Sequence, residues 1–336
     1  MFHPAGAGGS PATLEGMFRI RTLKLLFSIA ILGATLMAQD ARPKSKSKFP
    51  PGYTPGVTTI TSFDKDHTVI GWLEIVPFES RILHNTRMLR VLVPANYFSP
   101  HNVRRSYPVL YLQDGQNLFD DATSLHGEWH VDETVEHLVG SFKIPPMFVV
   151  GIDNAGEKRD SEYLPSPDPL NTKDGVIDEN AMQGKEYARF VVTEVMPFIE
   201  KRYRISRGAM NTGIGGSSYG GDIALYTALQ YPTVFGHVLV ESPPLWIGQN
   251  QLLKDAEKAK QLPQKMYIGI GTDEKPYGDA QRSAPAVDQV RDLESILVKK
   301  GMGAGRLRVN IEEGGEHNEA AWSRRLPDAL LFLYGP

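Results

Sequence analysis

The sequence predicts an α/β fold in which helices cover both faces of a mostly parallel central sheet. Short and nearly all-apolar runs, such as 107–112 (YPVLYL) and 147–152 (MFVVGI), are typical of strands buried on both faces. Segments with helical spacing alternate with these runs, which favours parallel strands joined by crossover helices. A length of 336 residues, 41% of them hydrophobic, is enough for one large domain with a buried core.

The order of these segments supports the same fold. We expect strands at 68–76, 87–93, 107–112, 147–152, 209–214, 237–240, 266–270 and 307–311. We expect helices at 131–139, 184–203, 222–230, 251–261, 287–300 and 319–333. In such sheets ligands bind outside the carboxyl ends of the strands, so chemically active residues should lie just after strands.

The N-terminal segment has the features of a secretory signal. Three basic residues within 19–24 precede an uncharged, mainly apolar run at 25–38, which ends in Ala38. Translation starting at Met17 instead of Met1 would place the basic region nearer the start. The run is short for a membrane span, so we expect cleavage after Ala38, with an uncleaved anchor as the alternative.

Domain boundaries follow from these features. We expect an N-terminal extension and signal peptide at 1–38, a flexible linker rich in Lys, Ser, Pro and Gly at 39–57, and one domain at 58–336. The mature protein would be exported, to the periplasm or the extracellular space, without a stable membrane span.

Composition excludes several classes of protein. The chain has no cysteine, which rules out disulfides, thiolate catalysis and cysteine-ligated metals. The formal net charge is -3 and no basic stripe crosses the body of the chain, so we expect no nucleic-acid partner. Oligomeric state has no signature in the sequence.

The glycine cluster at 215–221 contains the pattern G-x-S-x-G at Gly216, Ser218 and Gly220. It lies between an expected strand and an expected helix, as a nucleophile elbow requires. The serine of such an elbow occupies a strained turn, so the residues two positions away must be small. Ser217 fits less well, because Tyr219 would then take the place of a glycine.

A serine nucleophile needs a base, and an acid that orients the base. His317 lies in a glycine-rich loop after the last expected strand, which favours it as the base. His237 falls at the start of a strand and is expected to be structural. The acid should follow the penultimate strand, where Asp273 and Glu274 are adjacent. The pattern alone leaves the choice between them open.

Acyl transfer through a tetrahedral intermediate also needs hydrogen-bond donors for the oxyanion. One expected donor is the backbone N–H of Tyr219, directly after the nucleophile. The other is expected from the loop after the third core strand, at the N–H of Gln116.

Four motifs in this order resemble the putative-esterase family: DGQNLF at 114–119, GGSSYGG at 215–221, GTDE at 271–274 and GGEHNEAAW at 314–322. The resemblance covers 68–334. The family includes feruloyl and acetylxylan esterases, siderophore esterases, S-formylglutathione hydrolases and mycolyltransferases. It implies an α/β-hydrolase fold with Ser218 as nucleophile, His317 as base and Gln116 as oxyanion donor. It also implies Glu274 as the acid, although many relatives have Asp at that position.

Other features carry weaker signals. The run from His126 to His130 (HGEWH) lacks the Glu that a zinc helix needs directly after its first His, so no metal site is expected. Trp129 and His130 would border the substrate cleft or pack beneath it. The charged run 157–160 is expected in the loop after the fourth strand, where it could border the acyl pocket, although such a run is more typical of a solvated face. The acidic segment 168–179 is also typical of a solvated loop.

We therefore expect a serine carboxylic-ester hydrolase that needs no cofactor. Its substrate would be a small-molecule or polysaccharide-linked ester of a sugar, a phenolic acid or a siderophore. The motifs do not fix the acyl and alcohol parts. Two alternatives are an acyltransferase that passes the acyl group to a sugar hydroxyl and a non-catalytic homologue that binds a carbohydrate or another ligand.

Overall fold

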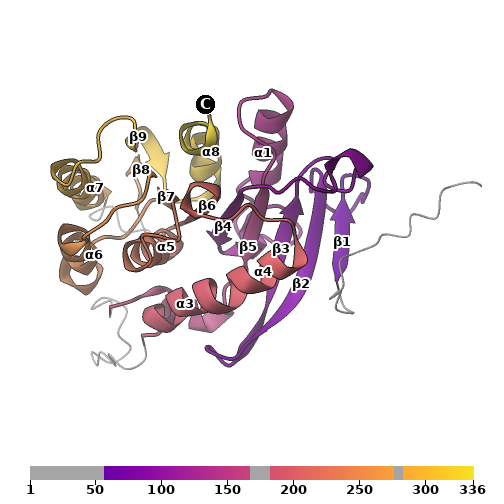
Figure 1. Ribbon diagram of the computed structural model, residues 1–336. Helices are drawn as coiled ribbons and strands as arrows, with labels where there is room; N and C mark the ends of the chain where they lie inside the picture. The colour runs from indigo at the N-terminus through magenta and orange to yellow at the C-terminus, as the bar shows by residue number, and fades with distance from the viewer. Residues whose placement is uncertain (1–56, 167–181, 276–282) are drawn as a thin grey trace, which may run out of the picture. The chain divides into compact units, whose positions relative to one another are not determined.

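The structure is a computed structural model that describes residues 57–166, 182–275 and 283–336 (Figure 1). The expected signal peptide, most of the linker and the acidic segment 168–179 lie outside these ranges. Within them, no helix combines the length and the apolar character needed to cross a membrane.

The described residues form a nine-stranded sheet in the order β1-β2-β3-β5-β4-β6-β7-β8-β9. The strands are β1 Thr58–Thr61, β2 Trp72–Ser80, β3 Asn85–Val93, β4 Val109–Gln113, β5 Phe148–Ile152, β6 Thr212–Ser217, β7 His237–Glu241, β8 Lys265–Asp273 and β9 Leu307–Glu316. The neighbouring pairs β1–β2, β2–β3 and β3–β5 are antiparallel. The pairs β5–β4, β4–β6, β6–β7, β7–β8 and β8–β9 are parallel. The expectation of a mostly parallel α/β sheet is confirmed.

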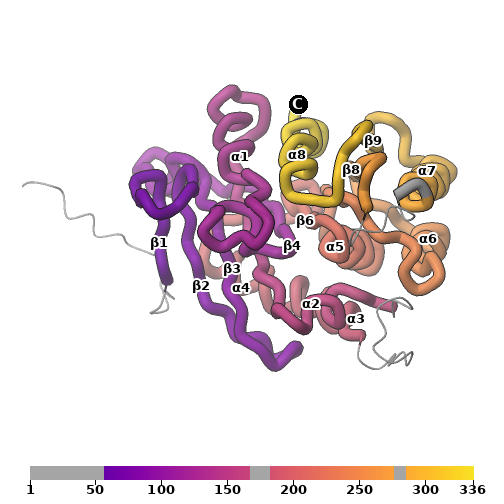
Figure 2. Tube along the Cα trace, turned by 180° about the vertical axis from the view of Figure 1, so that it is seen from behind, coloured from indigo at the N-terminus to yellow at the C-terminus, as the bar shows by residue number. Residues whose placement is uncertain are grey.

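Helices cover both faces of this sheet (Figures 1 and 2). The helices are α1 Val131–Gly140, α2 Arg159–Tyr163, α3 Gly184–Phe190, α4 Met196–Arg202, α5 Tyr219–Gln230, α6 Ile247–Lys258, α7 Ser283–Lys299 and α8 Glu319–Tyr334. Apolar side chains of α1 and α8 form one core, and those of α2 to α7 form the other. Alternate residues of β4 enter the two cores, with Tyr111 in one and Leu110 in the other. This explains why the strand is apolar at every position.

Several predictions about strands were wrong in detail. Residues 209–211 form a short 3-10 helix, and the strand expected at 209–214 runs from Thr212 to Ser217. The last strand was expected to end at 311 but runs to Glu316, so the glycine-rich segment before His317 is part of β9 and not a loop.

The first expected strand begins at Trp72 rather than Thr68, because the N–H groups of Thr68 and Ile70 donate to the Asp120 and Asp132 carboxylates instead of to a neighbouring strand. Strand β1 was not predicted, since its sequence TTIT has one buried residue and follows directly on the expected linker. Segment 184–203 is helical as expected, with a π-helical turn at Val191–Val195 between α3 and α4.

Six strand ends meet at one edge of the sheet. Parallel strands β4 to β9 all present their carboxyl ends there, and each is followed by a residue that the next section describes. This edge is where ligands bind in open α/β sheets.

Candidate active site

Ser218 occupies the sharp turn between β6 and α5. Its backbone has φ 55° and ψ −133°, a conformation that L-residues rarely adopt. The turn also brings Gly216 against Gly220, and a Cβ on Gly216 would lie 2.5 Å from the Gly220 carbonyl oxygen. The Ser218 N–H donates to the Glu241 carbonyl at 2.9 Å, which ties the turn to the end of β7. These contacts explain the spacing of the two glycines.

The two adjacent serines have different surroundings. Ser217 is the last residue of β6 and lies within the sheet, whereas Ser218 directly precedes α5. Tyr219 is the first residue of α5, so its backbone N–H lies at the N-terminus of that helix. The N-terminus of a helix favours negative charge, so this position can stabilise an anion that forms at Ser218.

His317 and Glu274 lie together at the ends of β9 and β8. The His317 Nδ1 is 2.6 Å from Glu274 Oε2. Because an ionised carboxylate only accepts, this contact assigns the proton to Nδ1 and leaves Nε2 free to take another. The second carboxylate oxygen accepts from the N–H of Gly271 at 2.6 Å and from the hydroxyl of Ser242 at 2.7 Å.

These partners determine the charge of Glu274. Burial acts to raise the pKa of this carboxyl group, but the His317 hydrogen bond and charge, together with the Gly271 and Ser242 donors, lower the pKa overall. Glu274 is therefore held as a carboxylate beside the imidazole.

Asp273, the alternative acid, has a different environment. Its carboxylate pairs with Lys275 at 2.7 Å, and both side chains are partly exposed, Lys275 to 50% and Asp273 to 37%. The structure thus brings only one of the two adjacent carboxylates, Glu274, into hydrogen-bond contact with His317.

Ser242 and Trp322 complete the surroundings of this pair; the sequence analysis missed Ser242 and included Trp322 only as the last residue of the motif at 314–322. Ser242 follows β7 with a φ of 47°, and its hydroxyl accepts from Trp322 Nε1 at 2.9 Å while donating to Glu274. The Trp322 ring packs edge-on against the His317 ring at 5.3 Å. A sequence signal existed, since Asn318 caps α8 and Trp322 follows it by one helical turn.

Gln116 lies in η2, the short helix Gly115–Asn117 that follows β4. Its carbonyl accepts from the Thr123 hydroxyl at 2.8 Å, and its side-chain Oε1 accepts from the Asn154 N–H at 3.2 Å. Across the three described ranges, the Gln116 N–H has no hydrogen-bond partner. The residue is thus fixed by its other groups, and its N–H is available to a ligand.

A partly buried ion pair anchors the start of the same loop. Arg159 Nε and Nη2 donate to the two Asp114 oxygens, both at 2.8 Å, and Asn154 Nδ2 donates to Asp114 Oδ1 at 2.7 Å. Burial acts to lower the pKa of Arg159, but the Asp114 charge raises it overall. The expectation that 157–160 is only a solvated charged run was therefore wrong for Arg159.

Within the described part of the chain, no hydrogen bond joins the Ser218 hydroxyl to His317. Such contacts are often long in free enzymes and shorten when substrate binds. The turn that carries Ser218 and the end of β8 are nevertheless linked through β7. The Glu241 carbonyl accepts from the Ser218 N–H, and the hydroxyl of the next residue, Ser242, donates to the Glu274 carboxylate.

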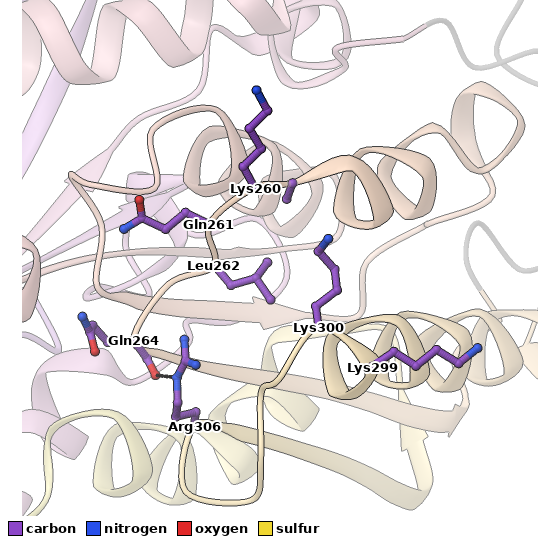
Figure 3. A pocket seen from close by; sticks show the side chains of 8 residues that line it. Lys260, Gln261, Leu262, Gln264, Lys299, Lys300 and Arg306 are labelled. Atoms are coloured by element: carbon purple, nitrogen blue, oxygen red, sulfur yellow. Dashed lines mark hydrogen bonds between the residues drawn. The ribbon is translucent and has the colours of Figure 1, made fainter.

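A basic hollow of about 760 Å³ lies elsewhere, between the ends of α6 and α7 and the starts of β8 and β9 (Figure 3). Its lysines Lys260, Lys299 and Lys300 extend separately, and Arg306 Nε donates to the Gln264 carbonyl at 3.0 Å. This is the amino-end edge of the parallel strands, opposite Ser218. We assign no part of the candidate active site to it.

Comparisons with known proteins agree with this fold and place the chain in a family. The Bacillus subtilis protein YbbA is 25% identical over 250 residues, which cover 74% of this chain and 93% of that relative. A solved ferulic acid esterase matches with a TM-score of 0.58 at 19% identity, covering 78% of this chain and 97% of that one. The enterobactin esterase FES from Shigella flexneri matches with a TM-score of 0.55 at 21% identity, covering 78% of this chain and 58% of that one.

The family assignment rests on a match over most of the chain. The family described as Putative esterase matches residues 80–333, a range that includes every residue of the site described above. Membership supports an enzyme that hydrolyses esters. The chain belongs to the putative-esterase family.

Proposed function

We propose that the protein is a serine carboxylic-ester hydrolase that works through an acyl-enzyme. The observation that carries the proposal is the placement of the His317–Glu274 pair at the same sheet edge as the strained Ser218 turn. A serine, a histidine and a carboxylate in this chain order are typical of α/β-hydrolases.

The first half-reaction acylates Ser218. Its hydroxyl oxygen attacks the ester carbonyl while His317 Nε2 takes the hydroxyl proton. Glu274 keeps the imidazole in the tautomer that can accept this proton, and then stabilises the imidazolium. The bond to the leaving alcohol breaks as the imidazolium returns the proton to the alcohol oxygen.

The second half-reaction restores the enzyme. Water attacks the acyl carbonyl and gives its proton to His317, and the acid product leaves as Ser218 regains a proton. In both halves, the N–H groups of Gln116 and Tyr219 would donate to the oxyanion. Loss of one such donor typically reduces kcat about 10²–10³-fold.

The proposed substrates are esters of a sugar, a phenolic acid or a siderophore. Structural neighbours named as a ferulic acid esterase and an enterobactin esterase support this range. We also propose that the protein is exported, because basic residues within 19–24 precede the apolar run 25–38. Hydrolysis rates on feruloyl, acetyl-sugar and siderophore-lactone esters would rank the substrate classes.

The nucleophile is tested by steady-state hydrolysis of p-nitrophenyl acetate. Ser218→Ala should lower kcat at least about 10³-fold, since removal of a triad nucleophile leaves only binding and oxyanion stabilisation. Ser217→Ala is the matched control, because it removes the same hydroxyl one position earlier. It should keep kcat within a few-fold of the wild type.

Two outcomes would contradict the proposal. One is wild-type protein that hydrolyses no short ester, and the other is equal loss of activity in both serine variants although both are folded by circular dichroism.

A further inference from the structure

Three potential metal ligands converge beside the candidate active site. Glu128, His130 and Glu133 each offer one ligand atom, and these atoms lie within 4.8 Å of one another. Glu128 and His130 flank Trp129, and Glu133 lies in the first turn of α1. The cluster follows the spacing E-x-H-x-x-E, which differs from the zinc-helix pattern considered for this segment.

The carboxylate of Glu128 is buried, and its charged neighbour is His130, whose Nδ1 lies 3.5 Å from Oε1. The residue is 2% exposed, and neither Oε1 nor Oε2 has a hydrogen-bond partner among the residues that the structure describes. A buried carboxylate that lacks compensation is costly, so buried charges are normally paired or bound to a metal.

The two separations that involve His130 match metal coordination, and all three ligand atoms lie within 4.8 Å of one another. His130 Nδ1 lies 3.2 Å from Glu133 Oε1 and 3.5 Å from Glu128 Oε1. Ligand bonds of 2.0–2.1 Å at tetrahedral angles place neighbouring ligand atoms about 3.3 Å apart. His130 is half exposed and adopts a left-handed backbone with φ 52°, so the site is open to solvent on one side.

We propose that Glu128, His130 and Glu133 bind a divalent transition-metal ion, with Zn²⁺ as the best match. An imidazole with carboxylates suits Zn²⁺, whereas Ca²⁺ prefers a shell of oxygen ligands only. Solvent would complete the coordination on the exposed side. This proposal departs from the sequence-based expectation of no metal, because that expectation did not consider Glu133.

The position of the site assigns the ion a structural role. The Trp129 N–H donates to the Asn117 carbonyl at 2.8 Å, and the Val131 N–H donates to Leu118 at 3.0 Å, so the ligand segment is joined to the end of η2. The Trp129 ring also packs edge-on against Trp322 at 6.0 Å. The ion would hold this segment to α1 without touching the reacting atoms. The inference is independent of the proposed hydrolysis.

The test is isothermal titration of ZnCl₂ into the full chain after EDTA treatment and dialysis. We expect one equivalent to bind to the wild type. Affinity should fall at least about 100-fold in Glu128→Gln and in His130→Ala, because each loses a ligand. His137→Ala is the matched control, since His137 lies on the same helix and is exposed; it should bind as the wild type does. His317→Ala should also retain binding, which separates this site from metal capture by the candidate catalytic histidine.

Thermal unfolding with and without Zn²⁺ gives a second readout that is independent of ester hydrolysis. A ligand that binds the folded state raises Tm, so excess Zn²⁺ should raise the Tm of the wild type and of His137→Ala but not that of Glu128→Gln. Failure of wild-type protein to bind Zn²⁺ would overturn the proposal, leaving His130 alone as the contact between the two carboxylates. Equal binding by wild type and both ligand variants would also overturn it, as would tight Ca²⁺ binding in place of Zn²⁺.

Discussion

At the scale of single residues, Glu274 is distinguished from Asp273 by its hydrogen bonds. Its two oxygens have three partners, namely His317, Ser242 and Gly271. Asp273, one residue earlier, pairs with Lys275 at the surface. Sequence alone could not decide which of the two carboxylates is the acid, because the direction in which each side chain points depends on the backbone at the end of β8. The family resemblance pointed to Glu274, and the hydrogen bond supports the same choice.

The first residue-scale prediction compares these two carboxylates. Glu274→Gln should lower kcat about 10³–10⁴-fold, because an amide in place of the carboxylate favours the wrong imidazole tautomer and gives no charge to stabilise the imidazolium. Asp273→Asn should change kcat less than about threefold, since exposed ion pairs contribute little. Measurement of kcat on p-nitrophenyl acetate decides between them. The reverse ranking would move the acid role to Asp273.

At the scale of elements, the ion pair Asp114–Arg159 joins the loop that carries Gln116 to α2. The partners are 45 residues apart, and Gly115 packs closely on β5, where an added Cβ would lie 2.8 Å from the Gly151 carbonyl carbon. We infer that this packing fixes the position of Gln116. No local pattern in the sequence reveals such a long-range pair, so the charged run 157–160 was interpreted as solvated.

Removal of one partner of the Asp114–Arg159 pair should therefore affect both the stability of the fold and the rate of ester hydrolysis. Arg159→Gln should lower the free energy of unfolding by about 2–3 kcal/mol, because the buried Asp114 carboxylate loses its counter-charge and keeps only the Asn154 side-chain donor. It should also lower kcat more than it raises KM, since the oxyanion is stabilised only in the transition state. Denaturant unfolding and steady-state kinetics measure these effects.

The double variant Asp114→Asn/Arg159→Gln is the control for that prediction. It should recover part of the lost stability, because the uncompensated charge is gone. If the single and double variants were equally stable, the pair would have no energetic coupling.

A second element-scale prediction concerns the start of β7. His237 is buried there against the Tyr334 ring of α8, with ring centroids 4.7 Å apart. Burial, with a smaller effect of Lys265, lowers the pKa of His237 to about 4. The folded state thus binds the proton less readily than the unfolded state. The stability contributed by neutral His237 is full above about pH 6.5 and is lost as pH falls toward 4.

The variant His237→Phe keeps the ring packing and removes this titration. From pH 7 to pH 5, the wild type should lose about 2 kcal/mol more unfolding free energy than the variant. Urea unfolding at the two pH values measures the difference. If the unfolding free energies of the two proteins changed equally with pH, the pKa of His237 would not be lowered by burial.

At the scale of the whole molecule, the fold was predictable because both cores leave regular patterns in the sequence. Runs such as 107–112 are apolar at every position when both faces of a strand are buried, and the helices between them keep a 3.6-residue period. Strand β1 carries one buried residue, so its pattern is too weak to detect.

The candidate site was predictable to different degrees. Ser218 has a local steric signature in Gly216 and Gly220, and His317 follows from chain order. Ser242, Arg159 and Glu133 have no such signature. Ser242 contacts Glu274 at the end of another strand, and Arg159 pairs with Asp114, which is distant in the sequence. Glu133 meets Glu128 and His130 only once the first turn of α1 has formed.

The account as a whole depends on Ser218 being the nucleophile. The most direct measurement is labelling of the full chain with a fluorophosphonate, followed by peptide mass spectrometry that locates the adduct. The account predicts one adduct per chain, on Ser218, lost in Ser218→Ala and strongly slowed in His317→Ala, because the hydroxyl then has no base. An adduct on Ser217, or no adduct on folded and ester-hydrolysing protein, would contradict it.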